Sequence, residues 1–258
     1  MNLALGLWVI LLGACVGSFL NVVVYRVPRG LSLWQPPSHC PHCQTPLRPW
    51  ENVPVLGWLG LRGRCSHCGV PISPRYPLVE LTTALWFALV WWRFGVSDDT
   101  VAAALLGSWL LALALIDLDT LTLPDSLLKS GLVIGLVWQG LRGWPDFYAG
   151  VLGMVVGLWL LDSLGWVASV VMGQPALGGG DPKLAAMLGA WLQGPALAVA
   201  LFLAVLTGAV VGVAGRCTGR LQPGQPMPFG PFLALGGAVA VLWGETLWRS
   251  YWQWLQMA

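Results

Sequence analysis

Long runs of apolar residues, separated by Gly, Pro and short polar turns, dominate the pattern along the chain. A helix needs about 20 apolar residues to cross a bilayer core of about 30 Å. The runs predict membrane helices at residues 3–25, 76–96, 100–116, 126–142, 147–171, 184–194, 196–214 and 230–248. Because the run 184–194 is too short to cross straight, it is either a short span or a re-entrant segment. The pattern therefore predicts seven or eight transmembrane helices.

Composition supports this interpretation. Apolar residues make up 57% of the 258 residues and charged residues only 9%, whereas a soluble domain carries about 25% charged residues. With 13 basic and 11 acidic residues the formal net charge is +2, which gives no basic surface for nucleic acid. We therefore expect an all-α polytopic membrane protein whose main environment is the lipid bilayer, and no nucleic-acid partner.

The distribution of Lys and Arg predicts the orientation in the membrane. With the N-terminus outside, the outer side carries three basic residues, Arg93, Arg142 and Arg249, and the inner side carries the other ten. Basic residues favour cytoplasmic loops, so residues 26–75 are expected in the cytoplasm. Residues 3–25 lack a basic start and a small-residue cleavage site, which favours a retained span over a signal peptide. The domain organisation we expect is a first helix (1–25), a cytoplasmic insert (26–75) and a membrane core (76–258).

The insert carries two cysteine pairs, Cys40-Pro-His-Cys43 and Cys65-Ser-His-Cys68. Two such pairs supply four thiolates in the tetrahedral arrangement that zinc prefers. Thiols stay reduced in the cytoplasm, which favours a metal over disulfides. We therefore predict a zinc-ribbon-like insert with a structural zinc ion; the alternative is a metal-free or disulfide-linked loop. His39, His42 and His67 lie beside the thiols and are taken as neighbours, not as ligands.

Carboxylates inside or beside apolar runs are costly and indicate function. The candidates are Glu80, Asp117, Asp119, Asp125, Asp162, Asp181 and Glu245. Asp117 ends the apolar run 110–116, and Asp181 directly follows Gly178-Gly-Gly180. The predicted topology places both at the cytoplasmic mouth of the bundle. Asp125 is more simply explained as an acid at a helix N-terminus, and Asp162 as part of a polar seam.

Two carboxylates that meet in a cleft of low dielectric constant share a proton and titrate as a pair. Such a pair can perform aspartic proteolysis, because one carboxylate takes a proton from water while the other polarises the scissile carbonyl. Gly178 and Gly180 permit close backbone approach and unusual φ angles. An extended substrate can then lie against the loop before Asp181.

Several blocks of the sequence resemble the bacterial type IV prepilin peptidases, also called leader peptidases. The first runs from Gly13-Ala-Cys15-Val-Gly17-Ser18-Phe19 through Asn21 and Arg26 to Pro28, and the two Cys pairs follow with Arg62-Gly-Arg64. Next come Pro71-Ile-Ser-Pro-Arg75-Tyr76-Pro77-Leu-Val-Glu80, and then Ile116-Asp117-Leu-Asp119 with Leu123-Pro124-Asp125. The last are Gly178-Gly-Gly180-Asp181-Pro-Lys183 and Pro228-Phe229-Gly230-Pro231-Phe. Their order and spacing cover the chain almost from end to end.

The resemblance implies a multi-pass enzyme of the bacterial inner membrane that cleaves the basic leader of prepilins and pseudopilins on the cytoplasmic side, after a Gly. Asp117 and Asp181 match the two catalytic aspartates of the family, with Gly178, Gly180 and Lys183 as the supporting loop. Long members with the Cys insert commonly also N-methylate the new N-terminus with S-adenosylmethionine. The resemblance therefore implies both activities here.

Several points stay open from the residues alone. The insert is too small for a soluble methyltransferase fold, so Asn21, Arg26, Arg75 and Glu80 are candidates either for methyl transfer or for anchoring the insert. Lys183 either holds the aspartate pair or binds an acidic substrate residue. The alternatives for the whole chain are a peptidase without methyltransferase activity, a transporter that uses the intramembrane acids, and a membrane-anchored zinc-ribbon docking module.

Overall fold

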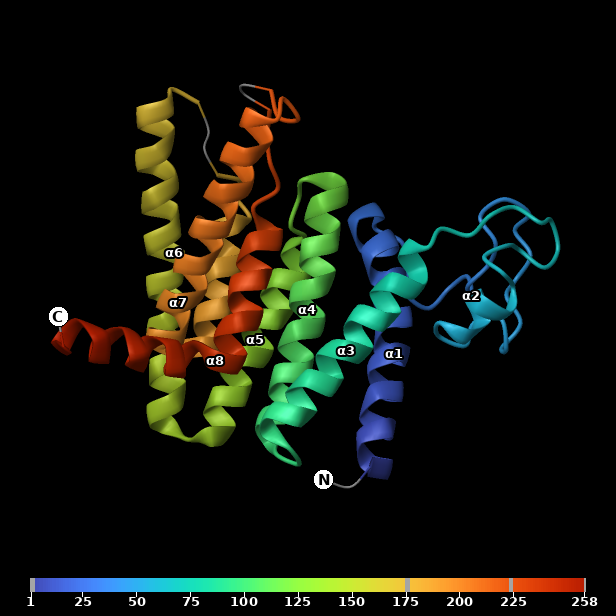
Figure 1. Ribbon diagram of the computed structural model, residues 1–258, viewed down its shortest axis with the longest axis horizontal. Coiled ribbons are helices and arrows are strands. Elements are labelled where there is room, and N and C mark those ends of the chain that lie inside the picture. Colours follow the sequence, from blue (N-terminus) through green and yellow to red (C-terminus); the bar gives the residue numbers. More distant parts are fainter. Residues whose placement is uncertain (1–2, 175–176, 223–224, 258) are drawn as a thin grey trace. The chain divides into compact units, whose positions relative to one another are not determined.

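The computed structural model describes residues 3–174, 177–222 and 225–257, and its regular elements there are helices (Figure 1). The all-α prediction is confirmed, and each predicted apolar run overlaps a helix. The helices are α1 (Leu3–Arg26), α2 (Leu56–Gly60), α3 (Arg75–Phe94), α4 (Asp98–Thr120), α5 (Asp125–Arg142), α6 (Trp144–Met172), α7 (Asp181–Cys217) and α8 (Gly230–Met257), with a short 3-10 helix, η1, at Val27–Arg29.

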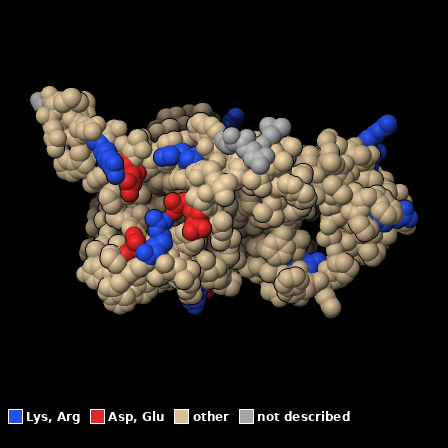
Figure 2. All heavy atoms as spheres, turned by 90° about the horizontal axis from the view of Figure 1, so that it is seen from below, with Lys and Arg blue, Asp and Glu red and all other residues tan. Residues whose placement is uncertain are grey.

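Within the described part of the chain, five helices are long and apolar enough to cross a membrane, namely α1, α4, α6, α7 and α8. The helices α3 and α5 cover two more predicted spans, but charged residues make them less apolar. Most large side chains exposed on the helices are Leu, Val and Trp, as expected of surfaces that face lipid. Figure 2 shows one face of the molecule, on which the few charged residues are scattered among uncharged side chains.

The chain divides into two units, residues 1–108 and 109–258. In the first unit α1 packs antiparallel against α3, and the loop-rich insert with α2 connects them (Figure 1). The contact depends on small residues, because a Cβ on Gly13 would lie 2.8 Å from Phe87 and a Cβ on Gly17 would lie 2.7 Å from the Glu80 Cα. A Gly-x-x-x-Gly spacing lets two membrane helices approach closely where dispersion contacts drive association.

In the second unit α6 and α7 pack against each other through small residues. A Cβ on Gly153 would overlap the Gly189 carbonyl, and a Cβ on Gly157 would overlap the Ala185 carbonyl. From Gly153 to Gly157 in α6 the contacted residue in α7 moves back from Gly189 to Ala185. The first part of α7 therefore runs antiparallel to α6. Contacts of Gly131 with Met187 and of Gly135 with Trp191 show in the same way that this part runs parallel to α5.

The helix α7 is a hairpin, because the chain leaves helical geometry at Gln193 (φ 59°, ψ −171°). Gly236 of α8 meets Ala200 while its neighbour Gly237 meets Leu188. In a straight helix Ala200 and Leu188 would be about 18 Å apart, so the two halves of α7 lie side by side. The predicted runs 184–194 and 196–214 are therefore the two arms of one hairpin. The first arm extends along α5, from Lys183 beside Asp125 at the start of α5 to Gln193 beside Asp146 at the start of α6, which favours the short-span alternative over the re-entrant one.

Buried polar contacts hold this reversal. The Gln139 side-chain amide donates to the Trp191 carbonyl at 2.8 Å, and the Trp191 indole N–H donates to the Gly131 carbonyl at 2.8 Å. The Gln193 amide donates to the Asp146 backbone carbonyl at 3.3 Å. Because unpaired backbone groups are costly in an apolar interior, these bonds satisfy carbonyls near the turn.

We predict that Gly189→Ala destabilises the protein by about 1–3 kcal/mol, the usual cost of overpacking, because the added methyl meets the Gly153 backbone. The measurement is the unfolding midpoint in detergent, followed by tryptophan fluorescence. Gly194→Ala is the matched control in the same helix, since its Cβ would have nothing within 4 Å. Equal midpoints for the two variants would contradict the packing argument.

Candidate functional site

The two aspartates singled out by the sequence both lie in the second unit. Asp117 lies in the last turn of α4 and Asp181 is the first residue of α7, and their side chains are only 5% and 6% exposed. The structure thus keeps both carboxylates out of solvent, although they are 64 positions apart in the sequence.

The glycine loop before α7 positions Asp181. The Gly178 backbone N–H donates to the Asp181 Oδ2 at 2.9 Å. A Cβ on Gly180 would lie 2.8 Å from the Leu123 side chain, so this glycine lets the loop pack against the segment that follows α4. The N-terminus of α7 also places its partial positive charge beside the carboxylate.

The start of α8 positions Asp117. The Gly230 backbone N–H donates to the Asp117 Oδ2 at 2.8 Å. A Cβ at position 230 would lie 2.8 Å from that same oxygen and 3.2 Å from the Asp117 Cβ. Sequence reasoning used Gly230 only as part of a family-like block and assigned it no role. The sequence shows a glycine at the start of an apolar run, but it does not show that this glycine contacts Asp117.

Lys183 contacts Asp125 and not the aspartate pair. The Lys183 Nζ lies 2.7 Å from the Asp125 Oδ1, and the Lys129 Nζ lies 3.1 Å from the other oxygen of the same carboxylate. These side chains are about half exposed or more. The ion pair connects the first residue of α5 to the first turn of α7. Asp125, interpreted from the sequence as a simple helix-terminal acid, is thus a bridge between two elements of the site.

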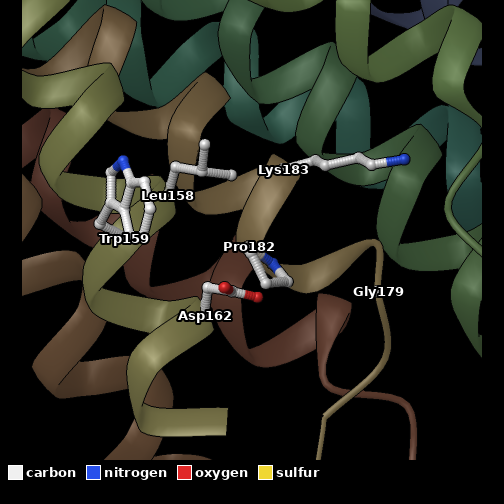
Figure 3. Close-up of a pocket in the computed structure, with 6 residues that line it drawn as sticks. All are labelled: Leu158, Trp159, Asp162, Gly179, Pro182 and Lys183. Atoms are coloured by element: carbon white, nitrogen blue, oxygen red, sulfur yellow. The ribbon is translucent and has the colours of Figure 1, made fainter. Parts of the chain in front are cut away.

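A cleft of about 220 Å³ borders the loop and the first turn of α7 (Figure 3). Its lining residues are Leu158, Trp159, Asp162, Gly179, Pro182 and Lys183. Pro182 directly follows Asp181 in the chain and forms one side of this cleft. A molecule in the cleft would therefore lie beside the residue that follows Asp181 in the chain.

The four cysteines of the insert form a second candidate site, in the first unit. Their Sγ atoms all lie within 4.8 Å of one another. The Sγ atoms of Cys40 and Cys68 are 3.8 Å apart and those of Cys43 and Cys65 are 3.9 Å apart. A tetrahedral site with metal–sulfur distances of about 2.3 Å has sulfur–sulfur edges of about 3.8 Å. The donor set therefore fits a zinc ion, and the clustering expected from the sequence is confirmed.

Each cysteine pair is held by the same backbone hydrogen bonds. The Cys40 N–H donates to the Thr45 carbonyl and the Cys65 N–H to the Val70 carbonyl. Four residues after the first cysteine of each pair the chain adopts a positive φ, at Gln44 (58°) and Gly69 (70°). This turn allows both thiols of a pair to point to one centre.

The hydrogen bonds around the thiols also set their protonation. The hydroxyl and backbone N–H of Thr45 lower the pKa of Cys43 to about 6, and backbone N–H groups of Cys68 and His67 lower the pKa of Cys65. At Cys68 a backbone hydrogen bond from Val70 is outweighed by burial and by the neighbouring thiols, which raise its pKa to about 11. A bound cation would remove the repulsion between thiolates and favour all four in the ionised form.

Two other candidate residues connect α1 to the following segments. The buried Arg26 donates to the Ser32 carbonyl at 2.9 Å and to the Pro36 carbonyl at 2.6 Å. The Asn21 amide donates to the Tyr76 carbonyl at 3.2 Å. These contacts hold the start of the insert to α1 and join α1 to α3.

Glu80 and Arg75 lie on α3. The buried Glu80 accepts a hydrogen bond of 2.6 Å from the Val55 N–H of the insert and makes a second one with the Ser18 side chain. Arg75 is the exposed first residue of α3, one helix position before Tyr76. The contacts of Glu80 connect the insert, α1 and α3.

Comparisons with known proteins match the chain over nearly its full length. Residues 11–94 match the bacterial peptidase A24 N-terminal domain, and residues 104–213 match the type IV leader peptidase family. A prepilin leader peptidase/N-methyltransferase of Stutzerimonas stutzeri is 40% identical, over 99% of this chain and 96% of the relative. Proteins of the same name from Pseudomonas aeruginosa and Burkholderia pseudomallei are each 41% identical, over 97% and 93% of this chain and 94% and 85% of the relatives. No solved structure matches the chain significantly.

Proposed function

This chain belongs to the type IV leader peptidase family, and we propose that it cleaves the leader from prepilins and pseudopilins and then methylates the new N-terminus. Its relatives carry a name that combines both activities, and the chain covers 96% and 94% of two of them. The observation that carries the peptidase proposal is that Asp117 and Asp181 lie in the same unit, both buried and each held by a glycine N–H.

The proposed reaction is hydrolysis by an aspartate pair. One ionised carboxylate takes a proton from a water molecule, whose oxygen attacks the carbonyl carbon of the leader's last Gly. The other, protonated carboxylate donates a hydrogen bond to the carbonyl oxygen, on which negative charge develops. Collapse of the tetrahedral intermediate breaks the C–N bond as the amine takes a proton from the pair. The mature chain is released with a free N-terminus.

We place this reaction on the cytoplasmic side of the inner membrane. Lys129 and Lys183 both pair with Asp125, at the end of the second unit where α5 and α7 begin. Arg142 ends α5 at the opposite end, next to the start of α6. An excess of basic residues marks the cytoplasmic side, which supports this orientation.

For the methyl transfer we propose S-adenosylmethionine as the donor. When bound, this donor would supply an electrophilic methyl group for the deprotonated N-terminal amine of the mature chain. We place this step where the insert joins α1 and α3, because Asn21, Arg26, Arg75 and Glu80 concentrate polar groups there. The proposal predicts that Glu80→Gln loses methyl transfer while it keeps leader cleavage.

We propose that the four cysteines bind a structural zinc ion. Cys40, Cys43, Cys65 and Cys68 would occupy all four tetrahedral positions, which leaves no position for a substrate or a reactive water. When bound, zinc would supply folding free energy to an insert that has few apolar residues of its own. The aspartate pair would carry out hydrolysis by itself.

We expect Asp117→Asn and Asp181→Asn each to lower leader cleavage by roughly 10²- to 10⁴-fold, the usual contribution of a general acid or base. Purified enzyme in detergent is incubated with a prepilin and S-adenosylmethionine, and the intact mass of the product is read. The wild-type product should lose its leader and gain about 14 Da for one methyl group. Asp98→Asn is the matched control, because it makes the same charge change at the exposed start of α4. Cleavage that survives in both Asp117→Asn and Asp181→Asn would refute the pair.

Gly230→Ala should lower kcat by about tenfold or more, because its methyl group displaces the Asp117 carboxylate and small misplacements of catalytic groups are costly. KM should change little, since substrate binding does not depend on this contact. Gly212→Ala is the control, because its Cβ would make only an ordinary 3.6 Å contact with Met227. Steady-state cleavage kinetics provide the measurement; a Gly230→Ala enzyme as fast as wild type would show that the close approach is dispensable.

The purified chain should contain one zinc ion, and Cys43→Ser should lose most of it. Mass spectrometry of the metal gives the stoichiometry, and the absorption of a Co²⁺-substituted sample reports thiolate ligation. Cys15→Ser is the control, because this free cysteine lies outside the cluster. We also expect the Cys43→Ser insert to be cut faster by trypsin. Zinc retained at full stoichiometry in Cys43→Ser would exclude the proposed ligand set.

A further inference from the structure

Asp162 is the one acidic group that faces the cleft beside α7. It lies on α6, where no other residue from 147 to 172 is charged. In the part of the chain that the structure describes, Asp162 makes no ion pair and no hydrogen bond through its side chain, although it lines the cleft. A carboxylate on an apolar membrane helix is costly, so its position calls for a cationic partner or access to water.

The second charged residue of the cleft does not neutralise Asp162. Figure 3 shows the Lys183 side chain directed away from Asp162, while Asp162 lies beside Pro182. The Lys183 Nζ is instead held at 2.7 Å by Asp125. Lys183 therefore pairs with Asp125, and the carboxylate of Asp162 is the negatively charged group beside Pro182 and Gly179 in the cleft.

The other walls of the cleft fit the remaining parts of a basic side chain. Trp159 and Leu158 come from the turn of α6 before Asp162, and Trp159 is 65% exposed. An indole face attracts ammonium and guanidinium groups, and apolar walls accommodate the methylene stem of Lys or Arg. The carboxylate supplies the charge-assisted hydrogen bond. A carboxylate, an indole and apolar walls together match Lys or Arg better than an acidic or purely apolar group.

We propose that Asp162, together with Trp159, binds a basic side chain of the substrate's leader and thereby contributes to substrate specificity. The inference rests on the proposed peptidase function, because Pro182 and Gly179 line the same cleft and flank Asp181 within two residues. A substrate whose scissile bond lies at Asp181 would have a residue near its cleavage point within reach of the cleft. Asp162 would act through binding and would take no part in the bond-breaking step.

The test uses a prepilin with one Lys moved through successive leader positions, each compared with Gln at the same position, in detergent free of lipid amines. At one position wild type should prefer Lys over Gln by roughly fivefold in kcat/KM, the size expected from a partly exposed ion pair and a cation–π contact. Asp162→Asn should remove this preference through a higher KM, with kcat unchanged. Asp162→Lys should instead favour Glu at that position. Glu245→Gln is the matched control, since it removes one exposed negative charge on α8.

Each outcome decides between the two proposals. If wild type shows no Lys preference at any position, or if Asp162→Asn keeps that preference, the specificity proposal is wrong and the peptidase proposal stands. If wild type cleaves no prepilin at all, the peptidase proposal itself fails. The reversed preference of Asp162→Lys guards against misfolding, because a variant that has merely lost structure cannot gain activity on the Glu substrate.

Discussion

Two carboxylates kept out of water inside an apolar bundle need hydrogen-bond donors from the protein itself. In this structure backbone N–H groups of glycines provide them, Gly178 for Asp181 and Gly230 for Asp117. A side chain at position 230 would occupy the space of the carboxylate. The need for a backbone N–H within hydrogen-bond distance thus favours glycine next to each carboxylate. Each acid lies near a helix N-terminus, where backbone N–H groups have no partner within the helix.

The hairpin in α7 makes the burial of both carboxylates within the second unit possible. An α7 that crossed the bundle in one straight helix would not bring Leu188 and Ala200 to adjacent residues of α8. Because the chain reverses at Gln193, both arms can pack on the same neighbours. The N-terminus of the short first arm, at Gly180 and Asp181, then packs against Leu123 in the segment that follows α4. Small residues make this packing possible, since membrane helices associate through close contact more than through the hydrophobic effect.

The insert follows a different physical principle. Its helices are the short α2 and the 3-10 helix η1, and its order comes from the four clustered thiols, from Arg26 and from Glu80. A metal-bound insert can be stable without an apolar core. This separation suits the bifunctional reaction that we propose, because cleavage requires a buried acid pair while methyl transfer requires room for a polar cofactor.

The sequence alone predicted much of this protein. The length of its apolar runs determined the all-helical class, because a bilayer requires about 20 apolar residues per crossing. The spacing of the cysteines predicted their cluster, since the ligands of each pair are neighbours in the chain. The unusual acids Asp117 and Asp181 were evident because charge is rare in such runs. Tertiary structure alone decided that Gly230 donates to Asp117, that Lys183 pairs with Asp125, and that Asp162 faces a cleft beside Pro182. These contacts join residues on different helices, and neither hydrophobic periodicity nor motif spacing determines how far apart two helices lie.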